Sequence, residues 1–306
     1  MAEETRTAFL SIVGKPNVGK SSLLNRMIGQ KVAIVSNKPQ TTRTKIMGVL
    51  TDGPVQLVFT DTPGYFHPRN KLGEKMMEAV SDSIAGVDAV LFVVEPQPGL
   101  SEEEQELLNK LKQSGLPTVL AINKIDTVDE KEQLMPRIAE LSAQMEFTAI
   151  VPVCAVKGDG VDELLEELKK LAEPSVHFFP DDALTDQPER VIAAEIIREK
   201  MLRLLDKEVP HGTAVSLDRF SERTNRAGED ILDIDATIFC EKESHKGIII
   251  GKKGAMLKKI STYAREDMER FFGCKVNLHC WVKVKEGWRD RENYIRDFGL
   301  DNSGEL

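Results

Sequence analysis

The stretch Gly14-Lys-Pro-Asn-Val-Gly-Lys-Ser21 decides the fold of this chain, because it has the spacing of a phosphate-binding loop. The apolar segment 9–13 before it suits a buried strand, and segment 22–28 after it has no glycine or proline and suits a helix. The glycines let backbone N–H groups approach a phosphate, Lys20 adds a positive charge, and the Ser21 hydroxyl can ligate Mg²⁺. A loop that only turned the chain would not need this lysine and serine. The residues expected to bind a nucleotide are Gly14, Lys15, Pro16, Asn17, Val18, Gly19, Lys20, Ser21 and Ser22.

Length and composition indicate the class of protein and the number of domains. The chain has 306 residues, of which 41% are hydrophobic and 30% charged, so we expect a soluble protein with two domains. It contains no run of about eighteen apolar residues, so no transmembrane segment is expected. The start of the chain is polar and lacks the features of a signal peptide, which predicts a cytoplasmic location. With a net charge of −9, any nucleic-acid partner must be bound by a local basic patch.

The cysteines at positions 154, 240, 274 and 280 form no Cys-x-x-Cys pair, so we interpret them as reduced residues in or near the core. A zinc site formed by Cys274, His279 and Cys280 is the alternative. It is disfavoured because adjacent residues of a strand point to opposite faces of the sheet.

The first domain, residues 1–172, alternates strand-like and helical patterns. This alternation indicates an α/β domain with a doubly wound, mainly parallel sheet and helices on both faces. Strands are expected at 8–13, 44–51, 55–60, 89–94, 118–122 and 149–153, and helices near 20–28, 72–85, 102–114, 130–144 and 162–171. Ser101 and Glu104 form a capping box at the third of these helices. Two polar stretches, 30–43 and 64–71, are expected to border the phosphate loop and to order or relax with the nucleotide.

The sequence Asp61-Thr62-Pro63-Gly64 follows the predicted strand 55–60 directly. An aspartate at the carboxyl end of such a strand can hold Mg²⁺, and the Gly64 N–H can reach a terminal phosphate. Alone, this tetrapeptide would indicate a plain turn. Because it follows a strand in a chain that also has a phosphate loop, we expect all four residues to lie at the nucleotide.

The sequence Asn123-Lys124-Ile125-Asp126 follows the predicted strand 118–122 and selects the base. The Asp126 carboxylate can accept hydrogen bonds from N1–H and the exocyclic amine of guanine, whereas adenine has no donor at either place. We therefore expect Asn123, Lys124 and Asp126 to bind GTP or GDP. An ordinary surface loop is one alternative, disfavoured because the sequence follows a strand in a chain that has the other two motifs. A phosphate-loop ATPase or kinase is another, which Asp126 disfavours.

In this order the motifs resemble those of translation-factor-class small GTPases, and Gly-Lys-Pro-Asn-Val-Gly-Lys-Ser narrows the resemblance to the Era-like group. The resemblance implies that Thr42, and less readily Thr41, ligates Mg²⁺ together with Ser21 and Asp61. It also implies that guanine contacts Cys154, Ala155 and Val156. The group has serine where this chain has cysteine, but the implied contact to guanine O6 comes from the backbone N–H of the next residue.

For catalysis, the resemblance points to Lys20, Thr42, Gly64 and Asn17. Ras-like GTPases have a glutamine after the Asp-x-x-Gly motif to orient the attacking water, whereas this chain has Tyr65. Intrinsic GTP hydrolysis should therefore be slow. Asn17 matches a position that ligates K⁺ in some related GTPases, so our hypothesis is that K⁺ accelerates the reaction.

Residues 173–188 contain three prolines and no periodic pattern, which indicates a linker. The second domain, residues 189–306, is expected to begin with a helix at 189–208, followed by strands near 212–220 and 230–241. The apolar face predicted for this helix consists of Val191, Ala194, Ile197, Met201 and Leu204.

A Gly-x-x-Gly loop with two lysines lies between a short apolar helix and a predicted helix at 255–272. Such a loop can clamp a nucleic-acid backbone. Window 242–271 has eight basic residues against four acidic ones, and segment 275–285 alternates an apolar face with a basic one. Each feature has an ordinary alternative, namely a turn, a solvated face or a packed tryptophan. The residues expected to contact RNA are Lys246, Gly251, Lys252, Lys253, Gly254, Lys258, Trp281 and Lys283.

The second domain resembles a type II KH domain, a smaller α+β fold, and its pairing with the first domain extends the Era-like resemblance over nearly the whole chain. The resemblance implies binding to the 3′ end of 16S ribosomal RNA, a role in maturation of the small (30S) ribosomal subunit, and peripheral association with the cytoplasmic membrane. The alternative is a GTPase whose second domain binds protein or membrane and not RNA.

Overall fold

The computed structural model describes residues 4–128, 134–225 and 227–301, and these fall into two compact units. The first unit comprises Met1–Ala33, Thr42–Arg69 and Gly73–Asp186. The second comprises Ile34–Thr41, Asn70–Leu72 and Gln187–Leu306.

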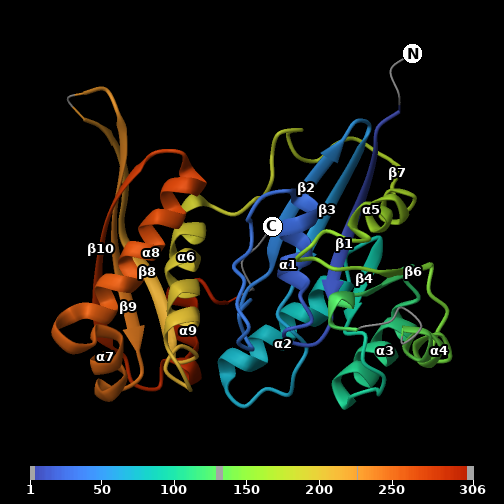
Figure 1. Ribbon diagram of the computed structural model, residues 1–306, viewed down its shortest axis with the longest axis horizontal. Helices are drawn as coiled ribbons and strands as arrows, with labels where there is room; N and C mark the ends of the chain where they lie inside the picture. Colours follow the sequence, from blue (N-terminus) through green and yellow to red (C-terminus); the bar gives the residue numbers. More distant parts are fainter. Residues whose placement is uncertain (1–3, 129–133, 226, 302–306) are drawn as a thin grey trace. The chain divides into compact units, whose positions relative to one another are not determined.

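The first unit is built on a sheet whose strand order is β2-β3-β1-β4-β5-β6, with β7 paired to β1 (Figure 1). The strands are β1 (Arg6–Val13), β2 (Ile46–Asp52), β3 (Val55–Asp61), β4 (Ala89–Val94), β5 (Thr118–Ile122), β6 (Ala149–Pro152) and β7 (Glu173–Pro174). Neighbours are parallel except at β2 and β7, which are antiparallel to β3 and β1. The predicted doubly wound, mainly parallel sheet is confirmed.

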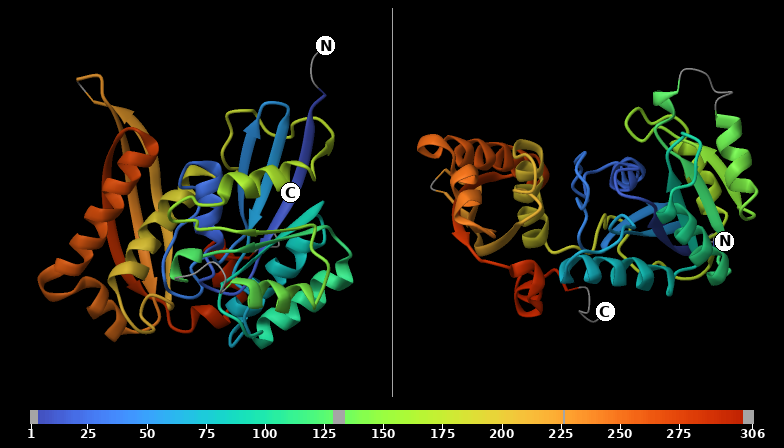
Figure 2. Two further views of the ribbon diagram at one scale, coloured as in Figure 1. Left: turned by 45° about the vertical axis from the view of Figure 1, so that its right-hand side comes forward. Right: turned by 90° about the horizontal axis from the view of Figure 1, so that it is seen from below.

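Helices cover both faces of this sheet, as Figures 1 and 2 show. They are α1 (Lys20–Ile28), α2 (Lys71–Ile84), α3 (Glu102–Ser114), α4 (Leu134–Ser142) and α5 (Val161–Lys169), with a 3₁₀ turn η1 (Ile125–Thr127). Helices α1 and α5 pack in one hydrophobic core, and α3 and α4 pack in the other. Strands β4 and β5 are buried at every position, which explains why they are continuous apolar runs in the sequence. Of the helix expected at 130–144, residues 130–133 lie outside the described part.

The segment predicted as a linker packs along the first sheet up to Asp186. The Gln56 side chain, which is fully buried on β3, accepts hydrogen bonds from the N–H groups of Phe178 and Phe179 at 2.8 and 3.0 Å. The Gln56 amide also donates to the Phe179 carbonyl at 3.0 Å, and the Leu184 carbonyl accepts from the Val49 N–H at 2.9 Å. Apart from the short strand β7, which pairs with β1, this segment therefore bonds part of its backbone to the sheet without forming a regular element.

The second unit has a three-stranded sheet in the order β10-β9-β8. Strand β8 is antiparallel to β9 and β10 is parallel to it. The elements are α6 (Glu189–Leu204), β8 (Thr213–Thr224), β9 (Asp230–Cys240), α7 (Glu243–Ile250), η3 (Lys252–Gly254), α8 (Ala255–Phe272), β10 (Lys275–Val284), η4 (Trp288–Asp290) and α9 (Glu292–Asp297). Side chains of α6, α7 and α8 pack on one face of the sheet in a single core. The predicted α+β arrangement of a KH domain is confirmed.

The apolar face predicted for α6 is partly wrong. Val191 is 39% exposed, whereas Ile192 and Ala193 are buried. The middle of the helix is buried on all sides, including the charged residues Arg198 and Glu199. The prediction assumed one buried stripe, but α6 packs against the core on one side and binds the segment 34–41 through charged side chains on the other.

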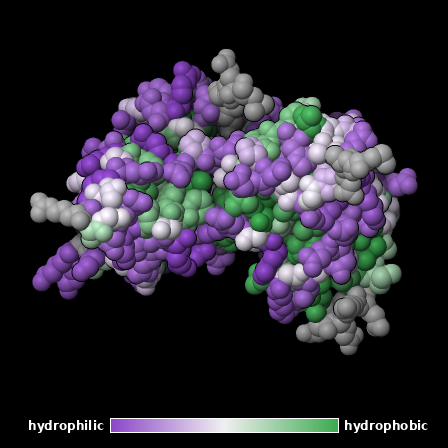
Figure 3. Space-filling view, turned by 90° about the horizontal axis from the view of Figure 1, so that it is seen from above, coloured by the Kyte–Doolittle hydropathy of each residue, from purple (hydrophilic) through white to green (hydrophobic). Residues whose placement is uncertain are grey.

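On the face in Figure 3, hydrophilic residues cover most of the surface and apolar residues form smaller patches. Among the described helices, none has the length and apolar character that crossing a membrane requires.

Candidate nucleotide site and nucleic-acid interface

The phosphate loop joins β1 to α1, and its geometry depends on glycine. Gly19 has a φ of 98°, and a Cβ there would lie 2.3 Å from Asn123 Nδ2, so any other residue would be strained and would displace Asn123. The Lys20 ammonium is buried and donates to the carbonyls of Gly14 and Lys15, both at 3.0 Å. Burial lowers the pKa of Lys20 to about 8, although the nearby Asp61 opposes this shift. The loop therefore carries a cation held close to its own backbone.

Three oxygen-bearing side chains meet beside the loop. The Ser21 hydroxyl donates to Asp61 Oδ2 at 2.5 Å and lies 2.9 Å from the Thr42 hydroxyl, which is 3.4 Å from the same carboxylate oxygen. Burial raises the pKa of Asp61 to about 6, against the opposing effect of Lys20. Asp61 Oδ1 is buried without a hydrogen-bond partner in the described part of the chain. Two hydroxyls and an unsatisfied carboxylate oxygen form a donor set that suits Mg²⁺.

The Thr41 hydroxyl bonds to a different group of residues from Ser21 and Asp61. It donates to the Lys38 carbonyl at 2.7 Å and contacts the Ser36 hydroxyl at 2.7 Å. Of the two threonines weighed from the sequence, the structure places Thr42 beside Ser21 and Asp61. Among residues 4–128, 134–225 and 227–301, no cluster of three or more histidine, cysteine and acidic side chains is placed to hold a metal.

After Asp61, the chain turns back onto the phosphate loop. A Cβ at Gly64 would lie 2.5 Å from the backbone of Pro16, so this contact requires glycine. The Tyr65 N–H donates to the Gly14 carbonyl at 3.1 Å. Thr62 is buried and its hydroxyl donates to the Ile12 carbonyl at 2.9 Å, so it supports the strands behind the site.

Tyr65 occupies the position where a glutamine would orient water. Its hydroxyl donates to Glu106 on α3 at 2.8 Å. Burial and this carboxylate raise the pKa of Tyr65 to about 12, so the phenol remains protonated. Its side chain is directed to α3.

The residues predicted to read the base lie in two loops. Asn123 connects them: its Nδ2 donates to the Val18 carbonyl at 2.8 Å, and its Oδ1 accepts from the Ala155 N–H at 3.0 Å. Asp126 is exposed and accepts a hydrogen bond from the buried Cys154 thiol at 3.1 Å. Lys124 forms an ion pair with Glu95 at 2.6 Å. The structure thus brings together the Asn-Lys-x-Asp loop, the phosphate loop and residues 154–155.

Several supporting residues were not predicted from the sequence. Arg26 on α1 donates to the Ala155 carbonyl at 2.9 Å and also bonds the carbonyl of Val156, whose side chain is exposed. Glu104, buried on α3, pairs with Lys15 at 3.3 Å and with the buried Arg137 at 2.8 Å. The predicted capping box at Glu104 is present, but nothing in the pattern indicated its contact with the phosphate loop.

In the second unit, the Gly-x-x-Gly loop lies between α7 and α8, and both lysines are exposed. Lys253 has a φ of 54°, which turns the chain sharply into α8. Lys258 is exposed on α8 and Lys246 is half-buried on α7. Trp281 is 49% exposed, next to the exposed Lys283 on β10. The exposed indole and ammonium groups are available to a nucleic-acid strand, as expected from the alternation along β10.

Comparison with known proteins agrees with both units. Residues 9–124 match the family model of 50S ribosome-binding GTPases, and residues 208–289 match that of KH domains. GTPase Era of Clostridioides difficile is 45% identical over 97% of this chain and 99% of its own length. GTPase Era of Ruminiclostridium cellulolyticum is 48% identical over 96% and 97%.

Two solved structures are similar over 97% of this chain and 99% of their own, with TM-scores of 0.92 and 39% identity. One is a tyrosine-to-alanine variant of Aquifex aeolicus Era bound to GDP and AlF₄⁻, and the other is Era in complex with MgGDPNP and nucleotides 1506–1542 of 16S ribosomal RNA. From its motifs, its fold and these near full-length similarities, the chain belongs to the Era family of GTPases.

Proposed function

We propose that this chain is a Mg²⁺-dependent GTPase that binds the 3′ end of 16S ribosomal RNA and acts in maturation of the small ribosomal subunit. The observation that carries the proposal is that one chain combines the Ser21, Thr42 and Asp61 cluster with an exposed Lys252-Lys253 loop. The Era complex with nucleotides 1506–1542 of 16S ribosomal RNA supports this choice of RNA.

In this mechanism the chain positions GTP and neutralises its charge. Mg²⁺, held by Ser21, Thr42 and Asp61, supplies electrostatic stabilisation of the phosphates. Lys20 adds a further positive charge, and the Gly64 N–H is available to a terminal phosphate oxygen. Because Tyr65 has no amide and its hydroxyl is bonded to Glu106, intrinsic hydrolysis is slow.

We further propose K⁺ stimulation with Asn17 as a ligand. Asn17 is exposed at the tip of the phosphate loop with a φ of 66°, so its side chain is available to an ion near the phosphates. The test is GTP turnover in KCl and in NaCl at equal ionic strength, for the wild type and for Asn17→Ala. Faster turnover in KCl, lost in the variant, is expected. Equal wild-type rates in the two salts would refute the proposal.

The RNA partner is tested by titrating a short single-stranded RNA with the sequence of the 16S 3′ end. The protein is loaded with GDP or with a non-hydrolysable GTP analogue. Tighter binding with the analogue is expected. The double variant Lys252→Glu, Lys253→Glu should no longer bind the RNA, because two cations that face the RNA phosphates are replaced by anions. Absence of RNA binding in both states would favour the alternative, a GTPase whose second domain binds protein or membrane.

We also propose a cytoplasmic location with peripheral association with the membrane, which rests on the resemblance to the Era-like group. Flotation of the full chain with vesicles containing anionic lipid tests it. Recovery of the protein with the vesicles at physiological salt is expected, and its absence from the floated fraction would argue against membrane association.

A further inference from the structure

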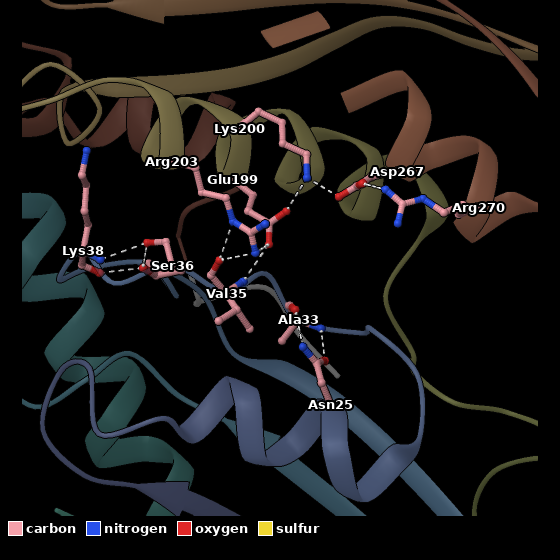
Figure 4. A network of polar contacts seen from close by, with 11 residues as sticks. Asn25, Ala33, Val35, Ser36, Lys38, Glu199, Lys200, Arg203, Asp267 and Arg270 are labelled. Carbon is pink, nitrogen blue, oxygen red and sulfur yellow. Dashed lines mark hydrogen bonds and ion pairs between the residues drawn. The ribbon is translucent and has the colours of Figure 1, made fainter. Parts of the chain in front are cut away.

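The segment 34–41 is part of the polar stretch expected to respond to the nucleotide, and it belongs to the same compact unit as α6. The Val35 N–H donates to Glu199 Oε1 at 3.1 Å. The Val35 carbonyl accepts from Arg203 Nε and Nη2 at 3.2 and 3.0 Å. Both polar backbone groups of this residue are therefore bonded to charged side chains of one helix (Figure 4).

The groups that bind Val35 are themselves fixed. Glu199 is fully buried and pairs with Arg203 and with Lys200, each at 2.9 Å. Lys200 is also buried and pairs with Asp267 of α8 (Figure 4). A buried carboxylate needs such partners, and here two cations hold it in place while it accepts from the Val35 N–H.

Two further contacts hold the rest of the segment. Arg198, which is 2% exposed and pairs with Glu195 at 2.5 Å, donates to the Thr41 carbonyl. Lys38 donates to the carbonyl of Leu205, the residue after the end of α6. Segment 34–41 is thus bonded to α6 at Val35 and Thr41, and at Lys38 to the residue that follows α6.

The residues that flank the segment are also fixed. Before it, Asn25 Oδ1 accepts from the N–H groups of Val32 and Ala33, both at 2.9 Å, as Figure 4 shows for Ala33. After it comes Thr42, whose hydroxyl lies with Ser21 and Asp61. Because Thr41 and Thr42 share a peptide bond, restraint of the Thr41 carbonyl limits where the Thr42 hydroxyl can lie.

We infer that α6 positions Thr42 for Mg²⁺ and GTP, with Arg203, Glu199 and Arg198 as positioning residues. The inference rests on the proposed Mg²⁺-dependent binding of GTP. A segment already ordered by α6 loses less conformational freedom when Thr42 ligates the metal, so the contacts favour the GTP complex over the GDP complex. They also make nucleotide preference depend on a helix of the RNA-binding unit.

The test compares Arg203→Met with the wild-type full chain. Arg203 is the most accessible of these residues, with 48% of its side chain exposed, so the variant should fold, and thermal unfolding checks this. Arg190→Met is the matched control: it changes the same residue type on the same helix and removes a 2.7 Å hydrogen bond to the Leu217 carbonyl, with no contact to segment 34–41 in the described structure. Arg203→Lys keeps a cation that can reach the Val35 carbonyl.

The measurements are the affinities for GDP and for a non-hydrolysable GTP analogue, and the Mg²⁺ concentration that gives half-maximal hydrolysis. For Arg203→Met we expect analogue affinity to fall roughly 2- to 10-fold, the size of one or two lost hydrogen bonds. The Mg²⁺ requirement should rise, GDP affinity should stay unchanged, and Arg203→Lys should recover part of the loss.

Unchanged analogue affinity in Arg203→Met would overturn the inference, as would an equal loss in Arg190→Met or an equal loss for GDP. These outcomes leave the proposed function intact as long as the wild type requires Mg²⁺. A wild-type chain that hydrolyses GTP equally well without Mg²⁺ would overturn the proposed function, and the inference with it.

Discussion

At the scale of single residues, the contacts of Asp126, the residue predicted to read the base, show how its carboxylate is held. The carboxylate is exposed, and the thiol of the buried Cys154 donates to it at 3.1 Å. Serine at this position in the Era-like group could donate to the same oxygen. The cysteine therefore preserves the donor, a contact that was not predicted, since the resemblance implied only that guanine O6 contacts the Ala155 backbone N–H.

The first prediction concerns the specificity that Asp126 provides. Asp126→Asn replaces two acceptor oxygens by one acceptor and one donor, so each lost hydrogen bond to guanine should cost roughly 1.5 to 3 kcal/mol. GTP affinity should fall by about tenfold to more than a hundredfold. Xanthine carries a carbonyl in place of the guanine amine, so XTP should bind the variant better than GTP does.

Competition of GTP, XTP and ATP against a fluorescent nucleotide measures this order. Asp162→Asn, an exposed change in the first turn of α5, is the control and should leave all three affinities unchanged. Retention of wild-type GTP affinity in Asp126→Asn would show that another group reads the base.

A second prediction separates the thiol from its backbone neighbours. Cys154→Ser keeps a donor and should bind GTP as the wild type does. Cys154→Ala removes the donor and leaves Asp126 less well oriented, so GTP affinity should fall about 2- to 10-fold. Calorimetric titration with GDP and GTP distinguishes the two, and equal affinities of the serine and alanine variants would contradict the assigned role.

At the scale of elements, the segment that follows α5 belongs to the first unit and is bonded to it through both backbone and side-chain groups. Gln56 is the side chain that anchors its middle, because the buried amide bonds the backbone of Phe178 and Phe179. Phe178 also packs edge-on against Phe9 of β1, with ring centroids 5.1 Å apart. The segment predicted as a linker therefore belongs to the first unit as far as Asp186.

Gln56→Ala tests this anchor. It leaves two backbone N–H groups without their acceptor, so the free energy of unfolding should fall by about 1 to 3 kcal/mol. Gln113→Ala, on the exposed side of α3, should change it by less than about 0.5 kcal/mol. Urea unfolding followed by fluorescence gives both values, and equal stability of the two variants would mean that the segment is not anchored by Gln56.

The elements also show what a sequence can and cannot predict. Strands β4 and β5 were expected at their observed bounds because buried parallel strands are unbroken apolar runs. Helix α6 was expected, but its buried side was only partly identified, because Arg198 and Glu199 are buried by partners distant in sequence. The hydrophobic periodicity of a sequence indicates which apolar side chains are buried. It does not indicate which charged side chains are buried against partners distant in sequence.

The candidate site was also predicted only in part. The phosphate loop and residues 123–126 are contiguous motifs with fixed spacing, so they could be identified from the sequence. The Glu104 contacts with Lys15 and Arg137 could not, because they join an α3 residue to the phosphate loop and to α4. Such pairs have no local pattern, and only the folded chain brings them together.

At the scale of the whole molecule, the last prediction follows from thermodynamic linkage between the two ligands. If the GTP analogue strengthens RNA binding by some factor, RNA must strengthen binding of the analogue, relative to GDP, by the same factor. Couplings of this kind are typically about 1 to 3 kcal/mol, or roughly 5- to 150-fold. We therefore expect the ratio of GDP to analogue dissociation constants to rise in saturating RNA.

Lys252→Ala with Lys253→Ala removes two exposed cations from the loop, so it should weaken RNA binding in both nucleotide states and leave the ratio measured without RNA unchanged. Arg203→Met should instead reduce that ratio and the coupling together, because it acts on the segment next to Thr42. Displacement of a fluorescent GDP derivative gives the dissociation constants of GDP and of the analogue, each with and without RNA. A wild-type ratio that RNA does not change, in a protein that binds RNA, would show that the two sites are independent.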